Sequence, residues 1–154
     1  MINIQPTGGA CGALVQGLNL SEDLTDDIMS DLTKALYNHR CLIIKNQNIT
    51  KEAYYQFAKQ WGDLIRHVLD YLRMPGYPEM MAIGNTEEKD KDDAVRSGAG
   101  VWHTDGSYIE DPTTVTMLHA IKIPKTGGET LIADMVQAYE SLEPSLKSKV
   151  DTLT

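Results

Sequence analysis

The residues best suited to chemistry in this sequence are a histidine and an aspartate two positions apart, His103 and Asp105. In an extended segment, residues two apart project to the same side of the backbone and stand about 6–7 Å apart along it. An imidazole and a carboxylate placed in this way could converge on one cation, while Thr104 between them points to the opposite side as a spacer. Together with a distant histidine, they would make the two-histidine, one-carboxylate triad that binds non-haem iron(II).

The same two residues also have a structural interpretation. His103 and Asp105 could lie in a surface turn in which the aspartate accepts a hydrogen bond from the histidine. The pattern His-x-Asp is short and arises often by chance, so the choice between the two interpretations depends on the surrounding sequence.

The segments after this pair are predicted to be strands joined by a turn and followed by helices. Apolar side chains alternate from Thr113 to Ile123, which is typical of a half-buried strand. Lys125-Thr-Gly-Gly128 predicts a turn, and Thr130-Leu-Ile-Ala133 a further short strand. Asp134 is expected to cap one helix, and Pro144 to begin another that continues to the last residue.

The part of the chain before the pair is predicted to combine short strands with two helices. The glycine-rich opening suggests two strands joined by turns. A helix is predicted to begin at Ser21, with an apolar face that repeats every four residues. Cys41-Leu-Ile-Ile44 predicts a strand buried on both faces. Thr50 is expected to cap a second helix, which ends at Gly62.

Residues 85–100 form a long, charge-rich stretch between a predicted strand at Met80–Ile83 and the ligand pair. Such a stretch is either a solvated surface loop or a cover for an active site. The aromatic residues Trp102 and Tyr108 are expected to pack around the site. His119 lies on the apolar face of its predicted strand, so we expect a hydrogen-bonded core residue there and not a metal ligand.

The composition is that of a soluble globular chain of single-domain size. Its 154 residues are 42% hydrophobic and 23% charged, and the net charge is −8. A surface this acidic repels phosphate backbones and anionic lipid heads, so neither nucleic acid nor a membrane is expected as a partner. The N-terminus lacks the pattern of a secretory signal, and Cys11 and Cys41 are expected to be reduced thiols. These features favour a cytoplasmic protein.

Several further segments accompany the ligand pair in a specific order. They are Trp102-His-Thr-Asp-Gly-Ser-Tyr108 with Pro112, Pro124-x-x-Gly127-Gly-Glu-Thr-Leu131, and upstream His39-Arg-Cys-Leu-Ile-Ile-Lys-Asn-Gln47 and Trp61-Gly-Asp-Leu64. Jointly they resemble the taurine/2,4-dichlorophenoxyacetate dioxygenase family of iron(II)- and 2-oxoglutarate-dependent oxygenases, over nearly the whole chain. The resemblance implies an α+β, mainly β fold: a partial double-stranded β-helix, or jelly roll, with flanking helices. Residues 1–154 would be the N-terminal portion of this single domain, with its C-terminal strands missing.

The resemblance also implies roles for four residues. His103 and Asp105 would be the first two ligands of Fe(II), and Thr130 would donate a hydrogen bond to the distal carboxylate of 2-oxoglutarate. His67 would bind the substrate, a small anionic molecule for which taurine or another alkylsulfonate is the first choice. With 2-oxoglutarate and O2 as co-substrates, the reaction would add a hydroxyl group to that substrate. The alternatives are an ordinary strand residue for Thr130 and an exposed loop residue for His67.

Two positions depart from the pattern of the taurine-specific members. Asp70 stands where a tyrosine would be expected three residues after His67, although Tyr71 is adjacent, and Ala99 stands where an asparagine would be expected. These departures concern the identity of the substrate and not the fold.

The family's third iron ligand, a downstream histidine, and the arginine that pairs with 2-oxoglutarate have no counterpart in this sequence. We therefore expect the 154-residue chain to be inactive alone and to need a partner fragment or self-association, for example as a homo-oligomer. Two rival functions are a truncated, non-catalytic fragment or binding module that needs a partner chain, and a cupin-like metal-binding barrel. A cupin-like site usually carries more histidines close together than this segment does.

Overall fold

The computed structural model describes residues 2–83 and 100–153, so the predicted loop at 85–100 lies, apart from Gly100, outside the described residues. The chain divides into two compact units. The first unit consists of Met1–Leu20, Leu24–Asn48 and Ile121–Thr154, and the second of Ser21–Asp23 and Ile49–Ala120.

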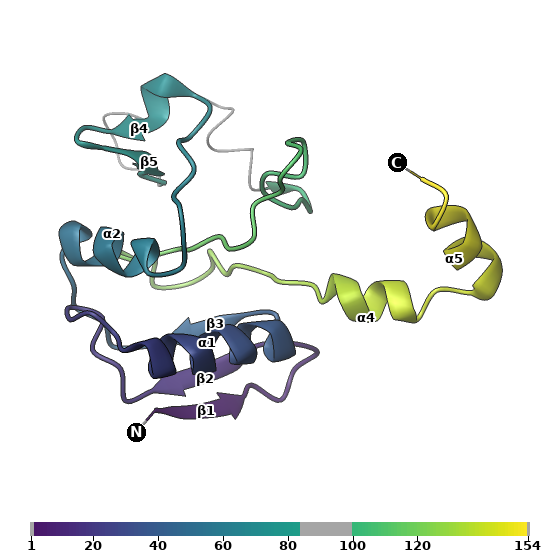
Figure 1. Cartoon of the computed structure of the whole chain (residues 1–154), viewed down its shortest axis with the longest axis horizontal. Helices are drawn as coiled ribbons and strands as arrows, with labels where there is room; N and C mark the ends of the chain where they lie inside the picture. Colours follow the sequence, from purple (N-terminus) through teal and green to yellow (C-terminus); the bar gives the residue numbers. More distant parts are fainter. Residues whose placement is uncertain (1, 84–99, 154) are drawn as a thin grey trace. The chain divides into compact units, whose positions relative to one another are not determined.

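A three-stranded sheet forms the centre of the first unit (Figure 1). Strand β1 (Asn3–Pro6) pairs antiparallel with β2 (Ala13–Gln16), and β2 pairs parallel with β3 (Leu42–Ile44). The predicted pair of strands at the N-terminus is therefore confirmed. Parallel neighbours require a crossover connection, and helix α1 provides it between β2 and β3.

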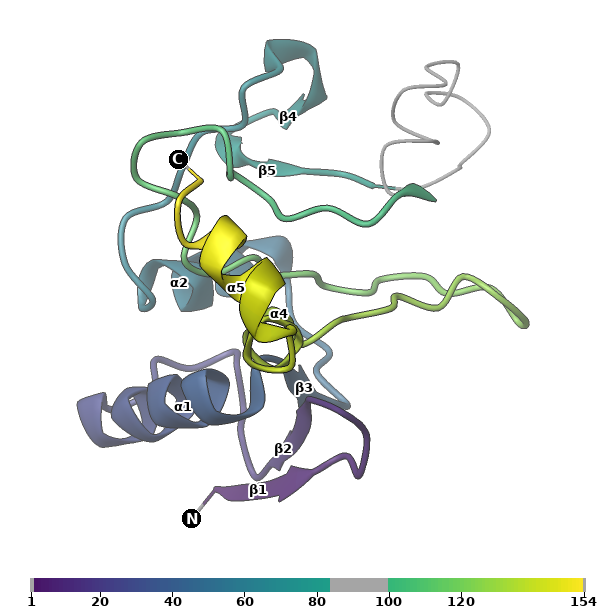
Figure 2. The same ribbon diagram turned by 90° about the vertical axis from the view of Figure 1, so that its right-hand side faces the viewer.

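Helix α1 (Asp26–His39) lies along one face of this sheet (Figures 1 and 2). It begins at Asp26 and not at Ser21 as predicted, because the side chain of Thr25 accepts a hydrogen bond from the Ile28 backbone N and caps the helix there. Apolar side chains from the helix, the strands and the loop after β2 form the buried core of this unit: Ala13, Val15, Leu20, Leu32 and Ala35.

The other face of the sheet is less well covered by the part of the chain that the structure describes. Ile43, in the middle of β3, is 38% exposed, so the prediction of a strand buried on both faces is wrong. Ile43 pairs with Leu14, and side chains alternate between the two faces of a strand. Ile43 therefore points away from the face of Ala13 and Val15, which are buried.

The second unit contains helix α2 (Lys51–Lys59), a short 3-10 helix η1 (Asp70–Leu72) and the antiparallel strands β4 (Arg73–Met74) and β5 (Tyr77–Met81). As predicted, Thr50 caps α2 by accepting a hydrogen bond from the Ala53 backbone N. The helix ends at Lys59, before the predicted end at Gly62, whose φ is 133°. The strand predicted at 80–83 is displaced toward the N-terminus.

Two side-chain hydrogen bonds connect α2 to β5. The Tyr55 hydroxyl lies 3.2 Å from Glu79 Oε2, and the Tyr77 hydroxyl lies 3.1 Å from Glu52 Oε1. The two tyrosine rings meet edge to face, with centroids 5.1 Å apart. These contacts fix the hairpin of β4 and β5 to the helix through polar side chains.

Residues 113–123 and 130–133, all of them described, form no strand, so both strand predictions for this region are wrong. A strand needs a hydrogen-bonded neighbour, and neither segment has one in the described ranges. The predicted alternation is nevertheless present in the burial of the side chains: Val115, Met117 and His119 are partly buried, whereas the residues between them are exposed. Beyond them, Ile121 is 86% exposed and Ile123 is 76% exposed.

Two short helices end the chain, α4 (Met135–Glu140) and α5 (Pro144–Val150). Both predicted helix starts are confirmed. Asp134 Oδ1 accepts hydrogen bonds from the backbone N atoms of the second and third residues of α4, each at 3.0 Å, and Pro144 is the first residue of α5. Arg40, just after α1, lies 3.5 Å from the same carboxylate oxygen. No helix in the described ranges is long and apolar enough to cross a membrane.

Candidate metal centre

The structure brings the side chains of His103 and Asp105 together. His103 Nε2 lies 3.3 Å from Asp105 Oδ1, so both side chains project to the same side of the backbone, as the spacing predicts. The segment that carries them, Trp102–Thr104, belongs to no strand or helix, and a turn follows from Asp105. The pair is therefore positioned locally, by the two-residue spacing.

A backbone carbonyl determines which nitrogen of His103 faces the carboxylate. His103 Nδ1 lies 2.8 Å from the carbonyl oxygen of Val101. Because a carbonyl can only accept, Nδ1 must carry a proton and donate it. In the neutral imidazole, Nε2 then has a lone pair directed at Asp105. A hydrogen bond from the other ring nitrogen to a carbonyl is the usual support of a metal-binding histidine.

The contact between the two side chains fits the turn hydrogen bond given above as the alternative as well as a metal site. A lone pair on Nε2 and a carboxylate oxygen 3.3 Å away repel each other unless a proton or a metal ion lies between them. The side chains of His103 and Asp105 are 48% and 49% exposed, so the pair is open to solvent. The described residues contain no group of three or more His, Cys, Asp and Glu side chains that could hold a metal ion. The described residues of this region therefore offer two candidate ligands, His103 and Asp105.

Gly106 fixes the turn directly after the ligand pair, a role that the sequence analysis did not assign. Its φ is 67°, a conformation that residues with a side chain rarely adopt. A Cβ atom added to Gly106 would overlap the hydroxyl oxygen of Thr113. The dipeptide Asp105-Gly106 is a turn signal that could have indicated this role, but the close approach of Thr113 is not visible in the sequence.

The two aromatic residues expected to pack around the site do not do so in the structure. Trp102 is 70% exposed and Tyr108 is 72% exposed. His119, expected in the core, is partly buried, and its ring lies 5.2 Å from that of Tyr54. Burial raises the pKa of the Tyr54 hydroxyl above its ordinary value, so this residue is a neutral packing partner for His119.

His67 lies in the same unit, in the segment just before η1. His67 Nδ1 lies 3.2 Å from the backbone N of Leu69 and 3.3 Å from the carbonyl oxygen of the same residue. In the tautomer in which Nδ1 accepts from the backbone N, the ring proton is on Nε2. His67 could therefore offer an N–H donor to an anion.

Arg73 positions this segment, which the sequence analysis did not predict. Its Nε donates to the backbone carbonyl of His67 at 2.7 Å, and its guanidinium forms an ion pair with Asp70. Asp70 is the residue that stands in place of the expected tyrosine. The structure thus gives this departure from the family pattern a local role.

Thr130 lies in the first unit, in an exposed segment without strand pairing. The turn predicted before it is consistent with the backbone, since Gly127 and Gly128 have φ values of 75° and 77°. The strand predicted to begin at Thr130 is absent from the described residues. Its role toward 2-oxoglutarate stays a prediction.

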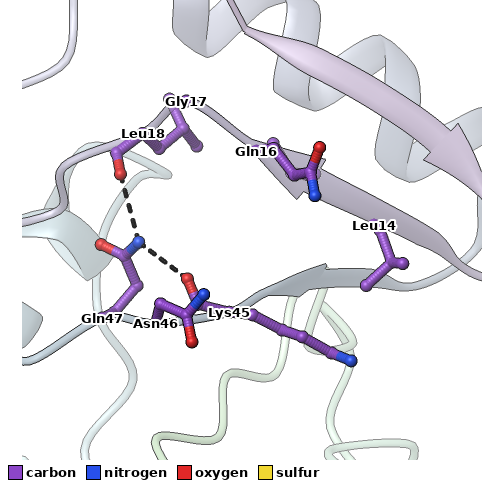
Figure 3. Close-up of a pocket in the computed structure, with 8 residues that line it drawn as sticks. Leu14, Gln16, Gly17, Leu18, Lys45, Asn46 and Gln47 are labelled. Carbon is purple, nitrogen blue, oxygen red and sulfur yellow. Dashed lines mark hydrogen bonds between the residues drawn. The ribbon is translucent and has the colours of Figure 1, made fainter.

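A separate cavity of about 380 Å³ lies in the first unit, where β2 and β3 end (Figure 3). It contains none of the predicted site residues, and Lys45 is its only charged lining residue. The amide of Gln47 donates to the carbonyls of Leu18 and Lys45, both at 3.1 Å, and accepts from the backbone N of Leu20 at 3.0 Å. Gln47 therefore ties the loop after β2 to the chain after β3.

Comparison with known proteins gives a family match over almost the whole chain. Residues 3–154 match the family model described as taurine catabolism dioxygenase TauD, TfdA family. The chain is 32% identical over 160 residues to the (S)-phenoxypropionate/alpha-ketoglutarate-dioxygenase of Sphingobium herbicidovorans. The aligned region covers 98% of this chain and 51% of that protein. It is 27% identical over 153 residues to the alpha-ketoglutarate-dependent sulfate ester dioxygenase of Pseudomonas putida, covering 99% of this chain and 48% of that protein.

The fold is similar to half of a solved structure. A crystal structure of a taurine dioxygenase from Burkholderia xenovorans superposes with a TM-score of 0.75 at 25% identity, covering 98% of this chain and 51% of that one. The chain thus spans about half the length of the curated relatives and solved structures that it matches. Small sheets with flanking helices are what a part of such a domain would contain.

Proposed function

The chain belongs to the taurine catabolism dioxygenase TauD, TfdA family, and on that premise we propose that residues 1–154 are the N-terminal portion of one Fe(II)- and 2-oxoglutarate-dependent dioxygenase domain. His103 and Asp105 are the proposed first two iron ligands. One observation supports this assignment: His103 Nε2 lies 3.3 Å from Asp105 Oδ1, while Nδ1 lies 2.8 Å from the carbonyl oxygen of Val101. An imidazole nitrogen and a carboxylate oxygen this close together can bind the same divalent cation.

Each proposed site residue has a task that its chemistry supports. Iron(II) bound at this site, with 2-oxoglutarate and O2 as co-substrates, would supply the oxidising power to hydroxylate a C–H bond. The carbonyl of Val101 orients the imidazole of His103 through Nδ1. Thr130 offers a hydroxyl donor, which could bind a carboxylate oxygen of 2-oxoglutarate. His67 offers its Nε2–H to the substrate.

The 154-residue chain alone is expected to show no conversion of 2-oxoglutarate to succinate. Its described residues provide two metal ligands and no group of three, and two ligands hold iron(II) weakly. The measurement is succinate formation by the purified chain with Fe(II), 2-oxoglutarate and oxygen, compared with a longer polypeptide that adds the downstream histidine and arginine expected from the family. Turnover by the 154-residue chain alone would show that this expectation is wrong.

The proposed substrate is a small anionic organic molecule, with taurine or another alkylsulfonate as the first choice. The names of the relatives specify a phenoxypropionate, a sulfate ester and taurine, all of which carry an anionic group. We also propose that the protein acts in the cytoplasm, where two cysteines in a chain of this size are ordinarily kept as thiols.

Replacing His67 tests the proposed binding of this anionic group. In a polypeptide that is active, His67→Ala is expected to raise the KM for the anionic substrate by about 10- to 100-fold, the equivalent of one charge-assisted hydrogen bond. The Fe(II)–2-oxoglutarate absorption band should be unchanged, because His67 is not a metal ligand. Val68→Ala is the matched control, since Val68 is adjacent and 59% exposed. An unchanged KM in His67→Ala would remove His67 from the substrate site.

A second candidate function is a binding module that needs a partner chain. Apolar side chains between the ligand pair and α4 are widely exposed, which favours this alternative: Leu118, Ile121, Ile123, Leu131 and Ile132. Exposed apolar surface of this kind usually marks an interaction site. A chain that stays inactive when the missing ligands are supplied, yet binds a partner, would favour the module over the enzyme.

A further inference from the structure

The two cysteines of the chain lie where the loop before β2 passes the end of α1. The backbone N of Gly12 donates to the carbonyl of His39 at 2.7 Å, and that of Ala13 donates to the carbonyl of Cys41 at 2.9 Å. Ala13 is the register partner of Leu42 in the parallel pair of β2 and β3. These two hydrogen bonds extend the contact beyond that register, to the residue directly after Cys11 and to Cys41 itself.

The resulting separation of the two cysteines suits a disulfide. Neighbouring hydrogen-bonded stretches of backbone lie about 4.8 Å apart, and Cys11 directly precedes the hydrogen-bonded Gly12. Disulfides span Cα separations of about 4.4–6.8 Å. The two cysteines therefore lie on adjacent stretches of backbone whose spacing is compatible with a disulfide.

The backbone at Gly12 departs from the regular strand conformation, which would direct the two cysteine side chains to opposite faces. In a regular strand, diagonal neighbours project to opposite faces, but Gly12 has a φ of 99° and interrupts the alternation just after Cys11. The two thiols also interact electrostatically, and the pKa of Cys41 reflects this interaction. Burial raises the pKa of the Cys41 thiol above its ordinary value, and the nearby Cys11 raises it further. Both residues are partly exposed and free in the structure, so a small reagent can reach them.

We propose that Cys11 and Cys41 form a reversible intramolecular disulfide with a low-molecular-weight disulfide, such as oxidised glutathione, as the oxidant. The thiolate of Cys11 attacks one glutathione sulfur, which breaks the glutathione disulfide and releases one reduced glutathione. The thiolate of Cys41 then attacks the sulfur of Cys11, which forms the protein disulfide and releases the second glutathione. The protein loses two protons and two electrons, and oxidised glutathione gains them.

This bond would act on the fold and not on the metal ligands. It would join the loop before β2 to the start of β3 and close a loop that contains the whole of α1. A cross-link that encloses this much chain stabilises a fold mainly by restricting the unfolded state. The oxidised chain should therefore unfold at a higher urea concentration than the reduced chain.

The test is a peptide map of the folded chain after incubation with oxidised glutathione. Trypsin cuts after Lys34, Arg40 and Lys45, so a disulfide joins the peptide 1–34 to the peptide 41–45. The expected product is this joined pair, with a mass lower than the two reduced peptides by two hydrogen atoms, and dithiothreitol should separate it. The variants C11S and C41S should instead carry one glutathione each and show no shift in urea midpoint.

Three outcomes would overturn the proposal. In the first, both cysteines carry glutathione and no joined peptide forms. In the second, the disulfide links two chains. In the third, the joined peptide forms only in urea. The last outcome would mean that the unfolded chain, and not the native arrangement of Cys11 and Cys41, brings the thiols together.

Discussion

His103→Ala is expected to abolish the visible absorption band that forms when Fe(II) and 2-oxoglutarate are added without oxygen, and to reduce turnover by more than about 100-fold. Loss of a residue that only supports a metal ligand already costs up to about 100-fold, so loss of the ligand itself should cost more. The variant belongs in a longer polypeptide that also carries the remaining family ligands. The measurements are an anaerobic titration followed by absorption, and succinate formation in air.

Thr104→Ala is the matched control for this prediction. Thr104 lies between the two proposed ligands, so its substitution disturbs the same segment without removing a metal ligand. The band and the activity should persist in Thr104→Ala, and circular dichroism should show that both variants are folded. A band of normal intensity and iron affinity in His103→Ala would mean that His103 is not a ligand.

Leu32→Ala is expected to lower the free energy of unfolding by about 3 kcal/mol, within the range of about 2–5 kcal/mol for buried leucines. Leu32 lies on α1 and has an exposed fraction of 0%, so the substitution removes buried apolar surface and leaves a cavity. A small domain has only about 5–15 kcal/mol of stability. The substitution should therefore move the urea midpoint of the chain clearly downward.

Tyr37→Ala on the same helix provides the comparison. Tyr37 is 63% exposed, so its loss should change the free energy of unfolding by about 0.5 kcal/mol or less, as is usual for surface positions. Equal effects of Leu32→Ala and Tyr37→Ala would mean that the face of α1 toward the sheet is not the one described.

Features that depend on neighbours in the sequence could be predicted. Thr50, Asp134 and Pro144 each mark a helix start, because capping and the fixed φ of proline act within one helical turn. The meeting of His103 and Asp105 is also local, since it follows from the two-residue spacing. Where two local signals compete, prediction is weaker, and α1 starts at the Thr25 cap instead of at Ser21.

Features that depend on distant segments could not be predicted. The alternation from Thr113 to Ile123 shows which side chains turn inward, but a strand also needs a neighbour, which an alternating pattern does not identify. The exposure of Ile43 has a similar origin, because an apolar run does not reveal whether a second layer covers the sheet. The hydrogen bond from the Arg73 side chain to the backbone carbonyl of His67 is likewise not indicated by any sequence motif.

The position of the buried core along the chain bears on biosynthesis. Strands β1, β2 and β3 and helix α1 all end by Ile44, so the sheet and the helix along it are complete before His103 has been translated, whereas Ile121–Thr154 of the same unit follow later. Domains and their parts tend to fold as their N-terminal segments become available. The layer of α1 on its sheet can therefore begin to assemble before the segment that carries His103 and Asp105 has been translated.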